Sequence, residues 1–174
     1  MTYVLQTYGA AVLRHKAEPV DRVTAAVRRL ADEMIRAMKK HEGVGLAAPQ
    51  IGKSQRLVVL YHPELHPKPL VMLNPEILKR AAEFFELGEG CLSLPGVNVN
   101  VSRPSAVRVK YQDLKGAMRE TEYEGLMARI VYHEVDHLNG KLIIDYLPLD
   151  QRLRFEAQIK RARHPTRATG EKPS

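Results

Sequence analysis

The sequence predicts an α+β fold, in which mixed or antiparallel β-sheets pack around a central buried helix and one further helix lies near each end of the chain. Apolar residues recur at helical spacing in three separate segments. Period-two alternation between these segments predicts strands. The two kinds of element do not alternate regularly along the chain, which favours α+β over a doubly wound parallel sheet.

Length and composition indicate one globular domain. The chain has 174 residues, of which 44% are hydrophobic and 27% charged, and these fractions are typical of a protein with its own core. We expect residues 1–163 to form this domain. Residues 164–174 lack apolar periodicity, so the sequence predicts a disordered, basic tail there.

The first helix is predicted soon after residue 20. Asp21 or Thr24 is placed to cap its start, and Gly43 is placed to end it. The apolar stripe of this amphipathic helix consists of Val23, Val27, Leu30, Met34, Ala37 and Met38.

Strands and turns follow in the middle of the chain. Pro63, Pro67 and Pro69 indicate a loop between the first two strands, and Asp113 to Gly116 indicates the turn of a hairpin. The expected strands are residues 56–61, 70–73, 97–101, 107–111, 118–123 and 142–144.

The central helix is predicted over residues 126–138, followed by a stop at Asn139-Gly140. Its side chains are apolar on most sides, which is typical of a buried helix. Histidines on such a helix need polar partners, and a metal ion supplies one. Asp150 is expected to cap a last amphipathic helix that runs to about Arg163.

The most informative stretch is His133-Glu134-Val135-Asp136-His137. Residues four apart share one face of a helix, so both imidazoles are able to reach a single metal ion. Glu134 projects beside such an ion, where a carboxylate takes a proton from water. The alternative interpretation is a pair of surface histidines on an ordinary helix.

Two histidines leave a metal ion short of a third protein ligand, and Cys91 is the outstanding candidate. It lies in a segment punctuated by glycine and proline, residues 89–96, where the backbone takes a special path. Two imidazoles and a thiolate suit zinc or ferrous iron with one position left open. The alternative is a buried thiol that only packs.

A second punctuated segment runs from Gly43 to Gln50. Its two glycines, two alanines and one proline leave room for a substrate backbone to lie against it. Gln50 would then offer an amide N–H to a developing oxyanion. Taken alone, the segment is also explained as a helix end followed by a turn.

Together, three segments resemble the signature motifs of the peptide deformylase family, and they follow the family's order. The similarity extends from Val12 to Leu147. It implies an enzyme that removes the N-formyl group from the N-terminal formylmethionine of nascent polypeptides and releases formate. The three segments are Gly43-Val44-Gly45-Leu46-Ala47-Ala48-Pro49-Gln50, Glu89-Gly90-Cys91-Leu92-Ser93 and His133-Glu134-Val135-Asp136-His137.

The resemblance also implies a role for individual motif residues. The metal ligands are Cys91, His133 and His137, and the metal is natively Fe²⁺, with Zn²⁺, Ni²⁺ or Co²⁺ as substitutes. Glu134 is the general base toward a metal-bound water. Gln50 and the backbone N–H of Leu92 stabilise the oxyanion.

Further residues are expected around this site. The Arg129 guanidinium is expected at the pocket rim in water, and Glu89 is expected to orient a metal-bound imidazole. Asp136 is expected to pair with Arg103. The neighbours expected for the methionine side chain are Gly45, Leu126, Arg129 and Ile130.

Two positions depart from the family's pattern. Tyr132, immediately before the first ligand, stands where the family usually has Gln. Asn98 stands near the place of an Arg that holds the substrate's backbone in many members. The first departure leaves the packing beside the metal open, and the second leaves open the preference for peptide residues beyond the first.

Three rival functions stay open at this point. A general HExxH metallopeptidase would cut internal peptide bonds, although such enzymes usually take their third ligand from further along the chain. A diverted deformylase would act on another N-formyl compound. A ribosome- or RNA-binding protein would keep the scaffold without the catalysis, although the complete set of catalytic residues speaks against it.

Positive charge is concentrated at the C-terminus. Residues 151–174 contain seven lysines and arginines against two glutamates, a net charge of +5 within the chain's +7. We expect residues 151–163 to dock on the ribosome surface; the alternative is a solvated helix.

The remaining expectations concern location and assembly. The N-terminus shows no secretion signal, and no apolar run approaches the length of a membrane span. We therefore expect a protein of the bacterial cytoplasm with no membrane partner, and the modest size and the absence of an exposed heptad favour a monomer. An organelle is expected only if a transit peptide was removed.

Overall fold

The computed structural model describes residues 3–163, and the chain divides into two compact units, residues 1–143 and 144–174. The tail predicted for residues 164–174 lies outside the described residues. A single domain over residues 1–163 stays a prediction.

The first unit is α+β, and its named strands all pair in antiparallel fashion. A five-stranded sheet has the order β1 (Gly45–Ala47), β2 (Leu57–His62), β3 (His66–Arg80), β6 (Ala106–Gln112) and β7 (Met118–Glu124). A separate two-stranded sheet pairs β4 (Phe84–Cys91) with β5 (Leu94–Pro104).

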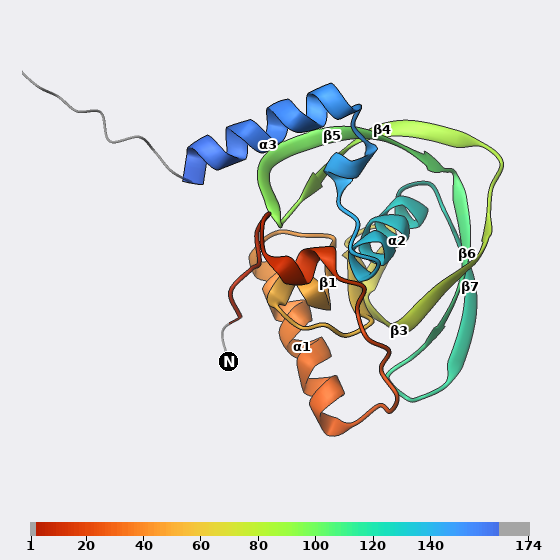
Figure 1. Ribbon diagram of the computed structural model, residues 1–174. Helices are drawn as coiled ribbons and strands as arrows, with labels where there is room; N and C mark the ends of the chain where they lie inside the picture. Colours follow the sequence, from red (N-terminus) through yellow and green to blue (C-terminus); the bar gives the residue numbers. More distant parts are fainter. Residues whose placement is uncertain (1–2, 164–174) are drawn as a thin grey trace, which may run out of the picture. The chain divides into compact units, whose positions relative to one another are not determined.

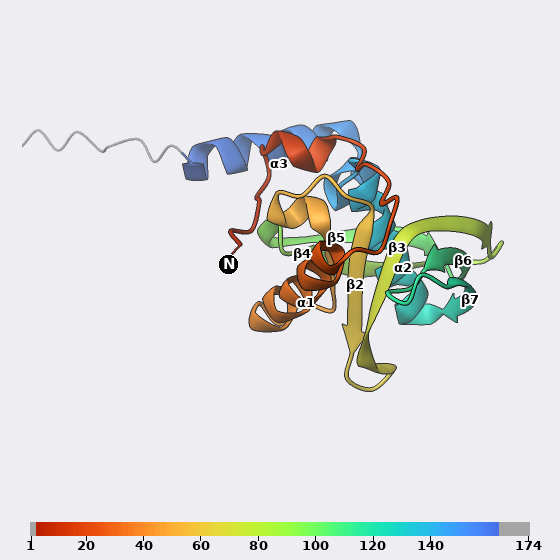
Figure 2. The ribbon, with the colours of Figure 1, turned by 90° about the horizontal axis from the view of Figure 1, so that it is seen from below.

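Helix α1 (Ala25–Lys40) covers one face of the larger sheet (Figure 2). Thr24 caps it, as predicted, because its Oγ1 accepts a hydrogen bond of 3.3 Å from the backbone N of Val27. The buried stripe recurs every three or four positions and packs against β1, β2 and β3. Its members are Val27, Leu30, Ala31, Met34 and Met38.

Strand β2 is buried on both faces, because helices cover both sides of it. Leu57 and Val59 belong to the apolar cluster that contains α1, whereas Val58 and Leu60 belong to the cluster that contains α2 (Gly125–Leu138). In Figure 1, strands β3 to β7 curve around α2. Because both faces of β2 are buried, the larger sheet is held between α1 and α2.

Several elements differ from their predicted extent. Strand β3 is much longer than residues 70–73 and absorbs Pro75 at an irregularity in its pairing with β6, where Asn74 has a φ of 50°. Strand β4 was missed, because its glycines and glutamates give no alternating pattern. The strand predicted at residues 142–144 is wrong, since a 3-10 turn spans Ile143–Tyr146.

Two further 3-10 turns, Ala11–Arg14 and Ala48–Ile51, belong to the first unit. The second unit contains helix α3 (Leu149–Arg163), which begins one residue before Asp150, so Asp150 lies in its first turn. Within this unit Arg152 pairs with Asp145 at 3.3 Å and with Glu156 at 3.2 Å. Among residues 3–163, none of the helices is long and apolar enough to cross a membrane.

Candidate active site and metal centre

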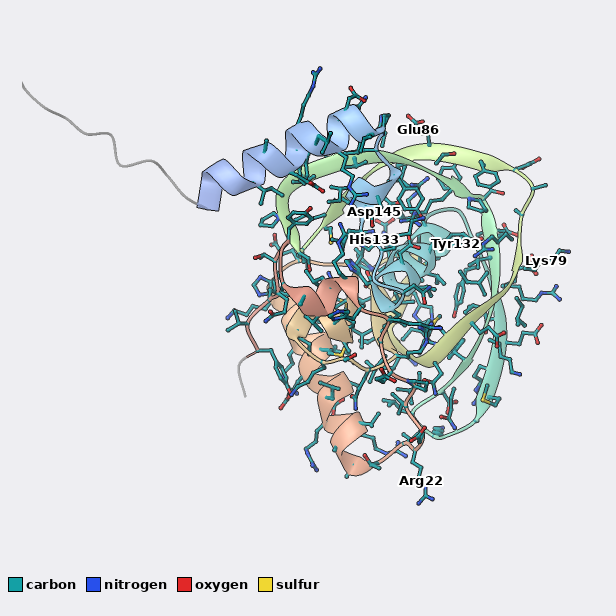
Figure 3. All side chains as sticks on the ribbon, in the orientation of Figure 1. Arg22, Lys79, Glu86, Tyr132, His133 and Asp145 are labelled. Atoms are coloured by element: carbon teal, nitrogen blue, oxygen red, sulfur yellow. The ribbon has the colours of Figure 1, made fainter. Side chains whose placement is uncertain are left out.

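Helix α2 presents two histidines on neighbouring turns. The ring centroids of His133 and His137 lie 5.0 Å apart, as expected for residues four apart on one face. Figure 3 shows Tyr132 and His133 leaving α2 on different sides. The Tyr132 hydroxyl donates a hydrogen bond of 3.0 Å to the carbonyl of Ala106 in β6. Tyr132 thus packs toward the larger sheet, away from the histidine pair.

Cys91 ends β4, where the pairing with β5 shifts register and the chain turns. Its Sγ lies 3.2 Å from Nε2 of His137. The ligand atoms of Cys91, His133 and His137 all lie within 4.8 Å of one another. The fold therefore brings together, from two elements far apart in sequence, the three residues expected to be metal ligands.

His133 makes a second contact that bears on its ligand atom. Its Nδ1 lies 3.0 Å from Oε2 of Glu89. A proton on Nδ1 leaves the Nε2 lone pair of a neutral ring available to a metal ion. Burial disfavours the charged ring, but the contacts with Cys91 and Glu89 outweigh it and raise the pKa of His133 to about 10. Surroundings that favour a proton here also favour a metal cation.

The Glu89 carboxylate is held by two buried arginines. Arg103 donates Nε to Oε1 at 2.5 Å and Nη2 to Oε2 at 2.8 Å, and Arg129 donates Nη1 to Oε1 at 2.7 Å. Burial alone would raise the pKa of Glu89, but the contacts with Arg103 and His133 lower it to about 2. The predicted pair of Arg103 and Asp136 is confirmed at 2.8 Å.

The expected position of the Arg129 guanidinium in water is wrong. Arg129 is 3% exposed, and its donors reach the carbonyls of Phe85 (2.7 Å) and Val101 (2.8 Å) as well as Glu89. The guanidinium carbon also lies 4.4 Å from the centre of the Phe85 ring. A buried cation is tolerated here because a carboxylate, three strand carbonyls (the third is that of Leu87, at 3.4 Å) and an aromatic face surround it.

Two buried polar atoms beside the cluster lack a hydrogen-bond partner within residues 3–163: Oε2 of Glu134 and Nδ1 of His137. Burial raises the pKa of Glu134 to about 7. Burial and the nearby cations hold the pKa of His137 well below its usual range, so this ring is neutral. Buried polar atoms without a partner are uncommon, and Oε2 of Glu134 is able to accept a hydrogen bond from a further group in the site.

Gly45 lies on β1, two residues before Ala47, which faces α2. A Cβ placed on Gly45 would lie 2.7 Å from Cδ of Glu134. Only glycine therefore leaves room for the Glu134 carboxylate at its present position.

Gln50 is 1% exposed and makes hydrogen bonds in two directions. Its Oε1 accepts from the backbone N of Ala47 at 2.7 Å, and its Nε2 donates to Oγ of Ser93 at 3.3 Å and points toward Cys91 Sγ at 3.7 Å. Sequence reasoning missed Ser93 as the partner that holds Gln50, although Ser93 belongs to the cysteine motif.

A cavity of about 710 Å³ opens beside these groups. Leu126 is 38% exposed, whereas Ile130 is buried in the wall. Asn98 also lines the cavity, so this departure from the motif borders the site directly. The expected substrate and oxyanion residues all line it: Gly45, Gln50, Leu92, Leu126, Arg129 and Ile130.

An α+β fold with His-Glu-x-x-His on a buried helix and a cysteine against both histidines defines a hydrolase of the HExxH class. A family model described as "Polypeptide deformylase" matches residues 3–152. The chain belongs to the polypeptide deformylase family.

Individual relatives agree with the family match. The chain is 44% identical over 159 residues to a peptide deformylase of Synechococcus sp., covering 88% of this chain and 78% of the relative. Among solved structures, the deformylase of Thermus thermophilus is 45% identical with a TM-score of 0.83, over 92% of this chain and 93% of that one. A Met-Ala-Ser-bound deformylase of Acinetobacter baumannii is 38% identical with a TM-score of 0.79, over 84% and 99%.

Proposed function

We propose that this chain removes the N-formyl group from the N-terminal formylmethionine of nascent polypeptides by hydrolysis of the formyl amide, with release of formate. The observation that carries the proposal is the convergence of Cys91, His133 and His137 within 4.8 Å. Beside this cluster lies the buried Glu134, whose Oε2 is unpartnered among residues 3–163. We also propose that α2 is the central helix of the catalytic domain.

The three converging residues fit a divalent metal ion. A thiolate and two imidazoles make a ligand set that accepts ferrous iron or zinc and leaves a fourth position open. We propose Fe²⁺ as the native ion, with Zn²⁺, Ni²⁺ or Co²⁺ as substitutes. When bound, such an ion supplies a Lewis acid that polarises the formyl carbonyl and acidifies water.

Glu134 is proposed as the general base and later the general acid. Its carboxylate is buried, and a pKa of about 7 suits proton transfer in both directions near neutral pH. Glu134 takes a proton from the attacking water and returns it to the leaving amine of the peptide. Gly45 gives this carboxylate the space it needs.

Gln50 and the backbone N–H of Leu92 are proposed as oxyanion donors. Ser93 and Ala47 hold the Gln50 amide at both its ends, so its Nε2 is oriented before substrate arrives. Donors fixed in this way stabilise the tetrahedral oxygen more than the planar amide, and loss of one donor typically lowers the rate by about 10²–10³.

The cavity is proposed to hold the methionine side chain. Ile130 and Leu126 supply apolar wall, and the stem of Arg129 adds to it. A structure similar to this chain was solved with bound Met-Ala-Ser, and the cavity volume of about 710 Å³ lies within the range of roughly 300–1,000 Å³ that is usual for ligand pockets.

The test compares wild-type protein with Glu134→Ala in a formate assay on formyl-Met-Ala-Ser after anaerobic purification. We expect the variant to keep its metal and its fold but to lose turnover. An unformylated peptide serves as the control substrate. Cleavage of that peptide, or full formate release by Glu134→Ala, would contradict the proposal.

Residues 151–163 are proposed to dock on the ribosome, and the protein is proposed to be a monomer of the bacterial cytoplasm. The docking proposal is supported by the net charge of +5 in residues 151–174, which favours contact with the phosphates of RNA. Co-sedimentation with ribosomes at low and high salt should show salt-sensitive binding by the full chain. Equal binding by a folded chain that ends at Asp150 would overturn the docking proposal.

A further inference from the structure

The sheet that carries Cys91 is separate from the sheet that packs beneath the histidines. Among the described strands, β4 and β5 pair only with each other. No residue of β4 or β5 belongs to either of the two apolar clusters that hold α1 and α2 to the larger sheet, although Leu92, in the turn between the strands, packs against the α1 cluster, and Leu94, Val99 and Val101 of β5 are buried. Polar contacts between α2 and these strands therefore add to the apolar ones in setting the position of Cys91 relative to α2.

Arg129 supplies such contacts from α2 to both strands. Its Nη2 donates to the carbonyl of Phe85 on β4 at 2.7 Å, and its Nη1 donates to the carbonyl of Val101 on β5 at 2.8 Å. The Phe85 ring stacks on the guanidinium. The planar fork of arginine is suited to holding several acceptors at fixed angles.

The same side chain reaches the histidine cluster through one carboxylate. Arg129 Nη1 binds Oε1 of Glu89, while Oε2 of Glu89 lies 3.0 Å from Nδ1 of His133. Arg129 is also one helical turn before His133, and Glu89 is two residues before Cys91. The Arg129 guanidinium thus contacts two groups. One is β4, the strand that ends at Cys91, and the other is the Glu89 carboxylate, which lies beside the His133 imidazole.

We infer that Arg129 is a positioning residue for the metal centre, which fastens the β4–β5 hairpin to α2 and so sets Cys91 against His133 and His137. This inference rests on the metal centre proposed above. The guanidinium of Arg129 then serves the metal site, and the aliphatic stem of the same side chain lines the proposed substrate cavity.

The test uses Arg129→Met, which keeps the stem and removes the guanidinium, and Arg129→Lys, which keeps the charge but lacks the fork. Arg108→Met is the matched control, because Arg108 is an exposed arginine on β6 whose side chain is 45% accessible. Co²⁺ affinity is measured anaerobically by competition with a chelator. The absorption spectrum reports whether thiolate and imidazoles surround the ion. Thermal unfolding of the metal-free proteins reports the fold.

We expect Arg129→Met to bind Co²⁺ about 10–100-fold more weakly than wild type, as for other groups that orient ligands. Arg129→Lys should fall between the two, and Arg108→Met should match wild type. At saturating Co²⁺ the loss should appear in kcat rather than in the KM for formyl-Met-Ala-Ser, since the stem remains. Wild-type Co²⁺ affinity in Arg129→Met, with a raised KM, would overturn the inference.

A double-mutant cycle separates positioning from general destabilisation. If Arg129 acts through Glu89, the loss of Co²⁺ affinity caused by Arg129→Met should shrink in a Glu89→Gln background. Full additivity of the two losses would contradict the route through Glu89. Should Arg129→Met fail to fold, the titration of Arg129→Lys decides, and wild-type affinity there overturns the inference. Failure of the wild-type chain to bind Co²⁺ through Cys91 would instead refute the metal centre itself.

Discussion

Helix α2 is attached to its surroundings in two different ways. Toward the five-stranded sheet it packs through apolar side chains, and Val131 and Leu138 share one apolar cluster with Val58 and Leu60. Toward the β4–β5 sheet it is also attached through charged side chains: Arg103 contacts Glu89 and Asp136, and Arg129 contacts Glu89. We call Arg103, Arg129, Glu89 and Asp136 the charged clasp. Apolar packing is non-directional, whereas charged hydrogen bonds fix the positions of individual atoms. The clasp lies where the proposed metal ligands must be held.

The largest expected effect comes from breaking the charged clasp. Arg103→Leu would leave Glu89 and Asp136 without the cation that both contact, and removal of one partner from a buried ion pair destabilises by about 3–5 kcal/mol. We expect Co²⁺ affinity to fall as well. Urea unfolding of the metal-free protein measures the first effect, with the exposed Arg108→Leu as control. A loss below about 1 kcal/mol, the range of surface pairs, would contradict the assignment.

Breaking the apolar attachment should have a different signature. Leu60 is fully buried in the α2 cluster, and Leu→Ala changes at such sites lower the free energy of unfolding by about 2–5 kcal/mol. The folded fraction of Leu60→Ala should nevertheless bind Co²⁺ like wild type. Leu65→Ala, at a residue that is 52% exposed, should change little. If Leu60→Ala weakened Co²⁺ binding as strongly as Arg103→Leu, the two attachments would not differ in kind.

Gly45 lies between the two attachments, where β1 meets the carboxylate of Glu134, the proposed general base. Gly45→Ala forces Glu134 to move, and a displacement near 1 Å at a reacting group lowers the rate by about 100-fold. Co²⁺ binding should persist, because no proposed ligand changes. Gly43→Ala is the comparison that leaves Glu134 in place, since its Cβ would meet Cδ1 of Leu92 at 3.0 Å and the backbone carbonyls of Gly45 and Met38 at 3.5 Å, but not Glu134. Equal kcat values for the two variants would refute this explanation of Gly45.

The two regions also differ in how far the sequence predicts them. Helical spacing and a capping threonine identify α1, and the turn at Asp113 identifies the β6–β7 hairpin, because both follow local patterns. Strand β4 carries no local pattern and is specified by its pairing with β5. The motifs predict which residues converge, but they do not predict the burial of Arg129. That burial depends on carbonyls of two strands far away in sequence.

The smallest expected effect concerns a charge pair outside the clasp. Asp113 Oδ2 accepts from Arg119 Nε at 2.8 Å in the exposed β6–β7 hairpin, and its Oδ1 accepts from the backbone N of Lys115 and Ala117. The contact with Arg119 lowers the pKa of Asp113 below its usual value near 3.8.

A carboxyl with a lowered folded-state pKa contributes stability above its unfolded pKa and loses it as pH falls through the folded value. Asp113→Asn keeps the turn acceptors but removes the charge. The urea midpoint of metal-free Asp113→Asn should therefore lie slightly below that of wild type at pH 6, and the difference should shrink as the pH falls below about 3.8. A difference that persists unchanged in acid would assign the effect to the turn geometry. A difference as large as that of Arg103→Leu would show that burial is not what makes the clasp strong.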